Sequence, residues 1–269
     1  MLRFDANLRW LFTESPMLER YEQAAASGFR GVEVAFPYEF PAREIAARLQ
    51  ANGLALVQIL SPFSWDAGER GIAALPGRQD EFRESLRRAV DYAAETGGPL
   101  IHVMPGRIPA GADRRPYADR FLENLGWAAD RAGAAGLSLV LEPCCRDRIP
   151  DFLYHRLGDA ARFIDQLARP NIRLCFDTFH VQMEEASLEQ ALQAYWPYLG
   201  HIQVGDVPGR HEPGSGGLPF PRLMRAVEER GWTGWIGCEY EPSGHTLDTL
   251  AWGAAFGLRD PRPAAAPRP

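Results

Sequence analysis

Short apolar segments that run directly into a polar side chain recur through the second half of this chain. Residues 137–141 run into Glu142, which a proline follows. Such a segment is too short for a helix and does not alternate, so it indicates a strand buried on both faces, as in a parallel sheet. Three later segments end in the same way, on Asp177, Gln203 and Glu239. The fold of this chain must therefore contain several buried strands, each with a polar residue at its carboxyl end.

The spacing of these four polar residues limits the fold further. The intervals between them are 35, 26 and 36 residues, which average near 32. A (β/α)8 barrel of roughly 250 residues uses about that much chain for each strand and its helix. The sequence therefore predicts an α/β protein with a single (β/α)8 TIM barrel.

Strand-like and helix-like segments also alternate along the whole chain. We expect strands at residues 2–8, 31–36, 54–60, 100–104, 137–141, 172–176, 200–202 and 235–238. We expect helices at residues 16 to about 28, 42–52, 80–96, 117–135, 158–168, 188–195 and 221–229. Ser15 is the expected N-cap of the first helix, with Pro16 in its first position.

The chain shows no internal boundary between domains. No Pro/Ser-rich linker divides it, which favours one barrel over residues 1–258. An open doubly wound sheet is the main alternative, but it would need a glycine-rich phosphate turn after the first strand, and residues 7–10 read NLRW. Residues 259–269 are mostly Pro, Ala and Arg and cannot build a core, so we expect a flexible tail.

Composition narrows the classes of partner. The formal net charge of -6 gives no electrostatic reason to expect nucleic acid or an anionic membrane, so a small solute is the favoured partner. The start lacks the apolar stretch of a signal peptide, and no run reaches the 18 or so residues of a membrane span. We expect a cytoplasmic protein with four reduced cysteines. A homo-oligomer is left open.

The polar residues at the strand ends form a candidate metal site. In a barrel the carboxyl ends of the strands meet on one face, so Glu142, Asp177, Gln203 and Glu239 should lie together. Three enclosed carboxylates repel one another, and a divalent cation removes that conflict. An all-oxygen set suits Mg²⁺ or Mn²⁺. The alternative is that these are salt-bridged acids at strand ends.

Two glutamates beside a held substrate suit proton transfer. One carboxylate can remove a carbon-bound proton beside a carbonyl to give an enediolate, and the other can return a proton elsewhere. We find no Ser-His-Asp or Cys-His set placed for covalent chemistry. Glu142 and Glu239 are therefore the candidate catalytic pair for isomerisation of an α-hydroxy carbonyl compound.

An ordered set of motifs resembles the hydroxypyruvate isomerase family, which belongs to the xylose-isomerase-like TIM barrels. The motifs cover residues 2–8, 65–71, 141–143 (LEP), 177–182 (DTFHVQ), 201–206 (HIQVGD), 210–216 and 237–240 (GCEY). The similarity extends from residue 1 to about 255. It implies one divalent metal held by Glu142, Asp177, Gln203 and Glu239, with the two glutamates as proton donor and acceptor. It also implies conversion of hydroxypyruvate to tartronate semialdehyde.

The same resemblance suggests further site residues. In related sugar epimerases the histidine that matches His180 contacts substrate oxygens, and Arg210 is a candidate for a substrate carboxylate or hydroxyl. We expect Glu69 and Arg70 to pair with each other and to shape their loop. For His180 and Arg210 the alternatives are a structural histidine and a solvated loop charge.

The chain also departs from the family's pattern, in places where we expect substrate to be held. The departures are Ile59 for an asparagine, residues 144–151 with Arg148 for an acid, and Gly217 for a glutamate. An inward-pointing Arg148 would favour a more anionic substrate. The alternatives to hydroxypyruvate isomerisation are a ketose 3-epimerase or 2-oxo-tetronate-type sugar-acid isomerase on the same site, an inosose-dehydratase-like lyase and a non-catalytic barrel. A zinc endonuclease of the same fold would want several histidines and a basic face.

Overall fold

The strands form one closed barrel in sequence order. The computed structural model describes residues 2–258, so the tail expected at residues 259–269 lies outside the described residues. Every strand pairs in parallel with its neighbours, and β1 closes the ring against β8. The strands are β1 (Arg3–Asn7), β2 (Gly31–Glu33), β3 (Ala55–Leu60), β4 (Leu100–His102), β5 (Ser138–Leu141), β6 (Ile172–Asp177), β7 (Leu199–Val204) and β8 (Trp235–Cys238). The predicted (β/α)8 barrel is confirmed, and the open sheet is wrong.

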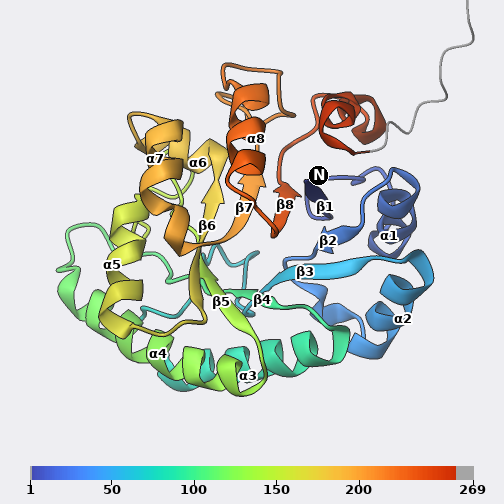
Figure 1. The fold of residues 1–269 in the computed structure, drawn as a ribbon. Coiled ribbons are helices and arrows are strands. Elements are labelled where there is room, and N and C mark those ends of the chain that lie inside the picture. Colours follow the sequence, from blue (N-terminus) through green and yellow to red (C-terminus); the bar gives the residue numbers. More distant parts are fainter. Residues whose placement is uncertain (1, 259–269) are drawn as a thin grey trace, which may run out of the picture.

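Helices cover the outside of the barrel (Figure 1). They are α1 (Met17–Ala26), α2 (Ala42–Asn52), α3 (Gln79–Thr96), α4 (Arg115–Ala134), α5 (Leu157–Leu167), α6 (Thr178–Glu184), α7 (Leu188–Tyr195) and α8 (Phe220–Glu229). Residues 2–258 also contain four short 3-10 helices: η1 (Pro37–Glu39), η2 (Trp196–Tyr198), η3 (Thr246–Thr249) and η4 (Ala251–Phe256). No helix within residues 2–258 combines the length and apolarity that a membrane crossing requires.

Glycines end two helices where the sequence predicts them to end. Gly53 and Gly97 take left-handed conformations, with φ of 62° and 74°, just after α2 and α3. The prediction for the start of α1 is wrong. Pro16 is the N-cap residue, and the Ser15 hydroxyl instead accepts a hydrogen bond from the Gln23 side-chain amide at 2.7 Å.

Alternation along the strands separates an apolar layer from a polar interior. Ile59 and Ile101 belong to the hydrophobic core that Phe82 and Leu86 of α3 also join. The interior instead carries a polar cluster: Glu33 on β2 accepts from Gln203 on β7 at 2.7 Å and lies 2.5 Å from His201. Since β2 and β7 are not adjacent in the barrel, these contacts cross its interior. The fold thus concentrates polar groups beneath the mouth.

Candidate active site

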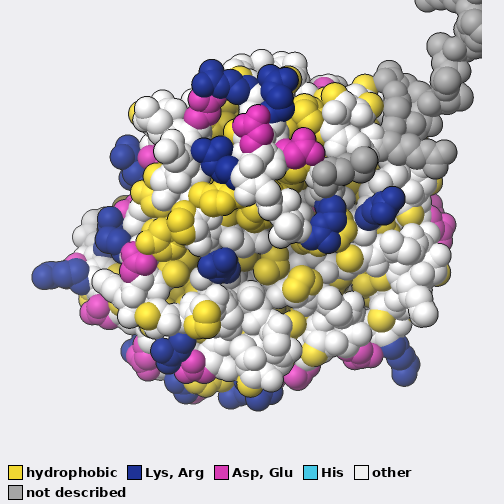
Figure 2. All heavy atoms as spheres, viewed as in Figure 1, with side chains coloured by type: hydrophobic (Ala, Val, Ile, Leu, Met, Phe, Trp, Pro, Cys, Tyr) yellow, Lys and Arg dark blue, Asp and Glu magenta, His cyan; other side chains and the backbone are white. Residues whose placement is uncertain are grey.

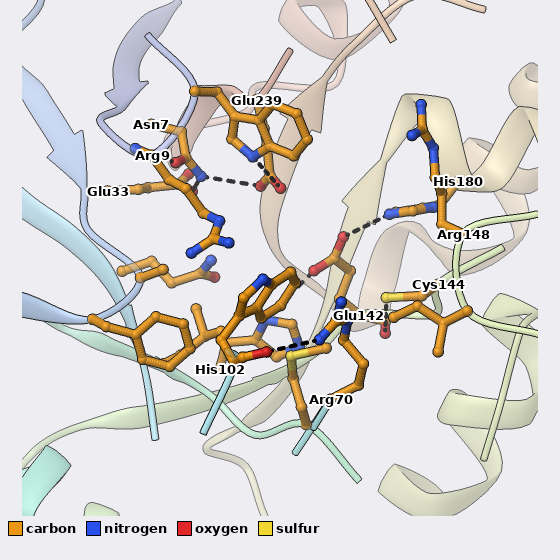
Figure 3. A pocket seen from close by; sticks show the side chains of 18 of the residues that line it. Asn7, Arg9, Glu33, Arg70, His102, Glu142, Cys144, Arg148, His180 and Glu239 are labelled. Carbon is orange, nitrogen blue, oxygen red and sulfur yellow. Dashed lines mark hydrogen bonds and ion pairs between the residues drawn. The ribbon is translucent and has the colours of Figure 1, made fainter. Parts of the chain in front are cut away.

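A pocket of about 290 Å³ opens at the carboxyl ends of the strands. Figure 3 shows Asn7 and Glu33 on the left of the view, Glu142 and His180 towards the right, and Glu239 near the top between them. These side chains come from strands or loops that are far apart in the sequence. The barrel is therefore what assembles them.

Three of the predicted metal-binding residues lie together. Glu142, Asp177 and Glu239 each offer a carboxylate oxygen, and these oxygens lie within 4.8 Å of one another. Burial and the charges of Glu239 and Asp177 raise the pKa of Glu142 well above its usual value. Burial also raises the pKa of Asp177, and it raises that of Glu239 to about 7, in both cases against the opposing charge of Arg210. A divalent cation would relieve the same repulsion.

Arg210 enters this acid cluster directly. Its Nη2 donates to Asp177 at 2.6 Å and to Glu239 at 2.9 Å. Burial lowers its pKa, but the two carboxylates outweigh burial and raise it. The residue has a φ of 61°, a conformation that costs a non-glycine residue about 1–2 kcal/mol. Arg210 therefore provides positive charge beside the acids, and its predicted contact with substrate stays a prediction.

His180 lies between Arg210 and Glu142. Its Nδ1 accepts the backbone N–H of Cys145 at 3.1 Å, which leaves the ring proton on Nε2. Burial and Arg210 lower the pKa of His180 well below its usual value, so the ring is neutral. Nε2 lies 3.5 Å from Glu142 and 3.0 Å from Nη1 of Arg210. The N–H groups of Cys145 and Arg210 thus point at the two ring nitrogens, although a neutral ring can accept at only one of them. A ligand oxygen that accepts from Arg210 and from Nε2 would remove this conflict.

Gln203 occupies a different position from the three carboxylates. Its Nε2 donates to Glu33, and its Oε1 accepts from the Cys175 thiol at 2.9 Å. Asn7 links the same glutamate to the acid cluster, because its Nδ2 donates to Glu33 at 3.0 Å and to Glu239 at 3.1 Å. Gln203 therefore belongs to the polar layer beneath the cluster. The three carboxylates fit a hard cation, whereas the participation of Gln203 stays a prediction.

Sequence reasoning missed Asn7 and Glu33 as site residues. The expected strand over residues 31–36 placed Glu33 in its interior, whereas β2 ends at Glu33. Asn7 likewise is the last residue of β1. The pattern of a strand that ends on a polar residue, which identified Glu142, was present at both positions. The sequence prediction did not use it there because apolar residues follow Asn7 and Glu33, so the expected strands ran on to residues 8 and 36.

The loop after β3 differs from the prediction. The Glu69 carboxylate accepts the Ser64 N–H at 2.7 Å and pairs with Arg78, while Arg70 reaches Glu69 only at its backbone carbonyl. The expected pairing of the Glu69 and Arg70 side chains is therefore wrong. The guanidinium of Arg70 lies over the ring of Trp65, 3.7 Å from its centroid, and lines the pocket.

The family departures fall only partly at the pocket. Cys144 and Arg148 line it, as expected. Ile59 does not, because it is buried in the hydrophobic core while its neighbours Gln58 and Leu60 face the pocket. Gly217 is also absent from the lining of this pocket. For Ile59 and Gly217 the expectation that they hold substrate is wrong. All four cysteines are buried free thiols, as predicted.

The structure is a TIM barrel with three carboxylates that converge at its mouth. Comparison with known families identifies the family to which such a barrel belongs. The family model described as xylose isomerase-like TIM barrel matches residues 21–257, so the chain belongs to that family. This confirms the resemblance found in the sequence.

Named relatives make the resemblance more specific. The chain is 43% identical over 253 residues to 2-oxo-tetronate isomerase of Cupriavidus necator, covering 94% of this chain and 97% of the relative. It is 37% identical to hydroxypyruvate isomerase of Escherichia coli, covering 94% and 98%. A solved structure from Brucella melitensis, named AP endonuclease, family 2, superposes with a TM-score of 0.92 at 38% identity, covering 96% and 100%. The relationship to isomerases is thereby confirmed at family level.

Proposed function

We propose that this protein is a metal-dependent isomerase of a small α-hydroxy-oxo acid. Hydroxypyruvate and tartronate semialdehyde are the leading pair, and 2-oxo-tetronate is the four-carbon alternative. The main support for this proposal is that Glu142 and Glu239 line the same pocket. Burial raises the pKa of both carboxyl groups.

The proposed reaction moves a proton within the substrate. One glutamate takes the proton from the hydroxyl-bearing carbon, and the C–H electron pair goes into an enediolate. A proton then returns to the former carbonyl carbon, and the hydroxyl proton passes to the former carbonyl oxygen, so that the hydroxyl-bearing carbon becomes the new carbonyl. The first carbon is oxidised and the second is reduced by the same two electrons, so no external oxidant or reductant is needed. The pocket of about 290 Å³ lies near the lower end of the range for ligand sites, which suits a substrate of three or four carbons.

Glu142, Asp177 and Glu239 would hold the divalent ion, Mg²⁺ or Mn²⁺. When bound, it would supply positive charge that stabilises negative charge developing on the substrate oxygens. Two of the protein's own side chains support this role. Arg210 already neutralises part of the acid cluster, and Nε2 of the neutral His180 carries a proton to donate to a substrate oxygen.

Proton transfer in D₂O tests the proposal. The Mg²⁺- or Mn²⁺-loaded protein is incubated with hydroxypyruvate, 2-oxo-tetronate and a panel of ketoses, and NMR follows the position of deuterium. We expect deuterium on the carbon next to the one that lost its proton. Deuterium on the original carbon would make the protein an epimerase instead. No label in any substrate would overturn both readings.

One structural relative is named an AP endonuclease, so DNA cleavage is tested as a control activity. The candidate acids here lie within a pocket of about 290 Å³, and the chain carries a net charge of -6. Figure 2 shows basic and acidic side chains interspersed over the face drawn. Phosphate backbones bind to clustered positive charge, so these observations favour a small acid over DNA. Incubation with an abasic-site duplex checks this, and we expect no cleavage.

A further inference from the structure

Two arginines outside the acid cluster also line the pocket. Arg9 and Arg70 both line it, and both guanidinium groups lie against the ring of Trp65. Their carbon atoms Cζ are 4.2 Å and 3.7 Å from the ring centroid. Trp65 thus supports two cations at one edge of a small pocket. In Figure 3, Arg9 and Arg70 point into the space that also faces Glu142 and Glu239.

Besides their contact with Trp65, these two arginines share a second feature: neither forms an ion pair within residues 2–258. Arg70 donates only to the backbone carbonyls of Trp65 and Glu69, at 3.5 Å and 2.6 Å. Within residues 2–258, no carboxylate lies within salt-bridge distance of Arg9 or Arg70. By contrast, the buried Arg210 is paired with two acids. The charge of Arg9 and Arg70 is therefore available to a ligand.

Both guanidinium groups are partly shielded from water. Burial lowers the pKa of Arg70, and the neighbouring charges of Arg107 and Arg9 lower it further, against the opposing charge of Asp151. Burial likewise lowers the pKa of Arg9, against the opposing charges of Glu239 and Asp66. A cation that is partly shielded from water and forms no ion pair gains most from an anion placed beside it. A carboxylate matches the planar donor pattern of guanidinium better than a hydroxyl does.

We propose that Arg9 and Arg70, supported by Trp65, bind the carboxylate of the substrate and select oxo acids over neutral ketoses. This inference rests on the proposed isomerase function and specifies its substrate class. Once the carboxylate is bound at this edge, the hydroxy-carbonyl end of a three- or four-carbon acid extends towards Glu142 and Glu239. Anchoring of the non-reacting end places the carbon that loses its proton near the carboxylates.

Paired substrates and single variants test the assignment. Hydroxypyruvate and dihydroxyacetone differ only by a carboxylate in place of a hydroxymethyl group, and dihydroxyacetone is measured as alternative substrate or as competitive inhibitor. In Arg9→Gln and Arg70→Gln we expect the KM for hydroxypyruvate to rise about 10- to 100-fold, with kcat changed by less than about 5-fold. The KM or Ki for dihydroxyacetone should stay within about 2-fold. Arg70→Lys, which keeps the charge but loses the planar fork, should fall between wild type and Arg70→Gln.

Arg107→Gln is the matched control. Arg107 is a nearby cation, but its guanidinium pairs with Asp151 and does not line the pocket. Its KM for hydroxypyruvate should stay within about 2-fold of wild type, and the circular dichroism spectra of all variants should match. A KM for hydroxypyruvate that is unchanged in both glutamine variants would overturn the inference. An equal rise for acid and ketose would overturn it too, because it would indicate a loop disturbance. If wild type labels no oxo acid in D₂O, the proposed function itself fails.

Discussion

At the residue scale, the acid cluster is governed by competition for positive charge. Arg210 now contacts two of the three carboxylates that would hold a cation. A divalent ion and a guanidinium both satisfy buried carboxylates, so metal binding must reduce the contacts of Arg210 with Asp177 and Glu239. The freed N–H groups of Arg210, beside Nε2 of His180, would then face the substrate. This reconciles the buried ion pair with the predicted substrate contact.

Glu142→Gln and Glu239→Gln test the catalytic pair. Glutamine keeps the size of the side chain but cannot accept a proton at neutral pH, so each change should lower kcat about 10²- to 10⁴-fold. Deuterium incorporation from D₂O should fall in parallel. Glu95→Gln, at an exposed position on α3, is the control and should leave kcat unchanged. Retained activity in Glu239→Gln together with lost metal binding would contradict the proton-transfer role.

Sequence alone predicted the acids better than the groups around them. Glu142 follows the apolar run 137–141 and Asp177 follows the apolar residues 174–176. The barrel brings the carboxyl ends of its strands together, so these two acids were expected to meet. Arg70 gave no such pattern, because a charged residue in a loop can face solvent or pocket with equal ease. Its position depends on the stacking with Trp65 and on the course of one loop. Contacts of this kind are tertiary, so no local pattern encodes them.

At the scale of elements, the sequence predicted eight strands and seven helices, and the structure contains all of them. It did not predict α6, which follows β6 without a loop because Asp177 caps it, accepting from the N–H groups of Phe179 and His180. A seven-residue helix is too short for a clear hydrophobic period. The same Asp177 therefore ends a strand, caps a helix and joins the acid cluster.

Gly71 connects the loop after β3 to the one after β4, next to Arg70. It has a φ of 95°, forms an isolated bridge with Pro105, and a Cβ there would lie 2.0 Å from the Met104 carbonyl oxygen. Gly71→Ala should therefore cost about 2–5 kcal/mol of unfolding free energy, from the backbone conformation and the clash together. Denaturant unfolding measures the loss.

Gly68→Ala is the control for Gly71→Ala. Gly68 also has a positive φ, of 82°, but a Cβ there meets no atom within 4 Å. Its substitution should cost only about 1–2 kcal/mol, the conformational part alone. Because Gly71 adjoins Arg70, the folded Gly71→Ala protein should also show a raised KM for hydroxypyruvate, whereas Gly68→Ala should not. Equal losses of stability in the two variants would contradict the clash.

At the scale of the whole molecule, the acid cluster makes stability depend on pH in an unusual direction. In the metal-free protein Glu239 has a pKa of about 7 against an ordinary 4.5, and the pKa of Glu142 is also raised. The folded state therefore keeps protons that the unfolded state releases. Where the folded state binds more protons than the unfolded state, the free energy of unfolding falls as pH rises. Glu239 and Glu142 therefore destabilise the metal-free protein progressively between about pH 4.5 and 7.

A bound divalent cation should reverse this trend. Because the cation binds the ionised carboxylates, binding releases protons and strengthens as pH rises through about 7. At 100 times the Kd it should add about 2.7 kcal/mol of stability, or roughly 5–10 °C in Tm. We expect the Tm gain from Mn²⁺ or Mg²⁺, measured by scanning fluorimetry, to be larger at pH 7.5 than at pH 5.5. Sodium chloride of equal ionic strength should give no such gain, and neither should Mn²⁺ added to a Glu142→Gln, Glu239→Gln double variant. A gain independent of pH, or one equalled by sodium chloride, would show that the three carboxylates do not hold the ion.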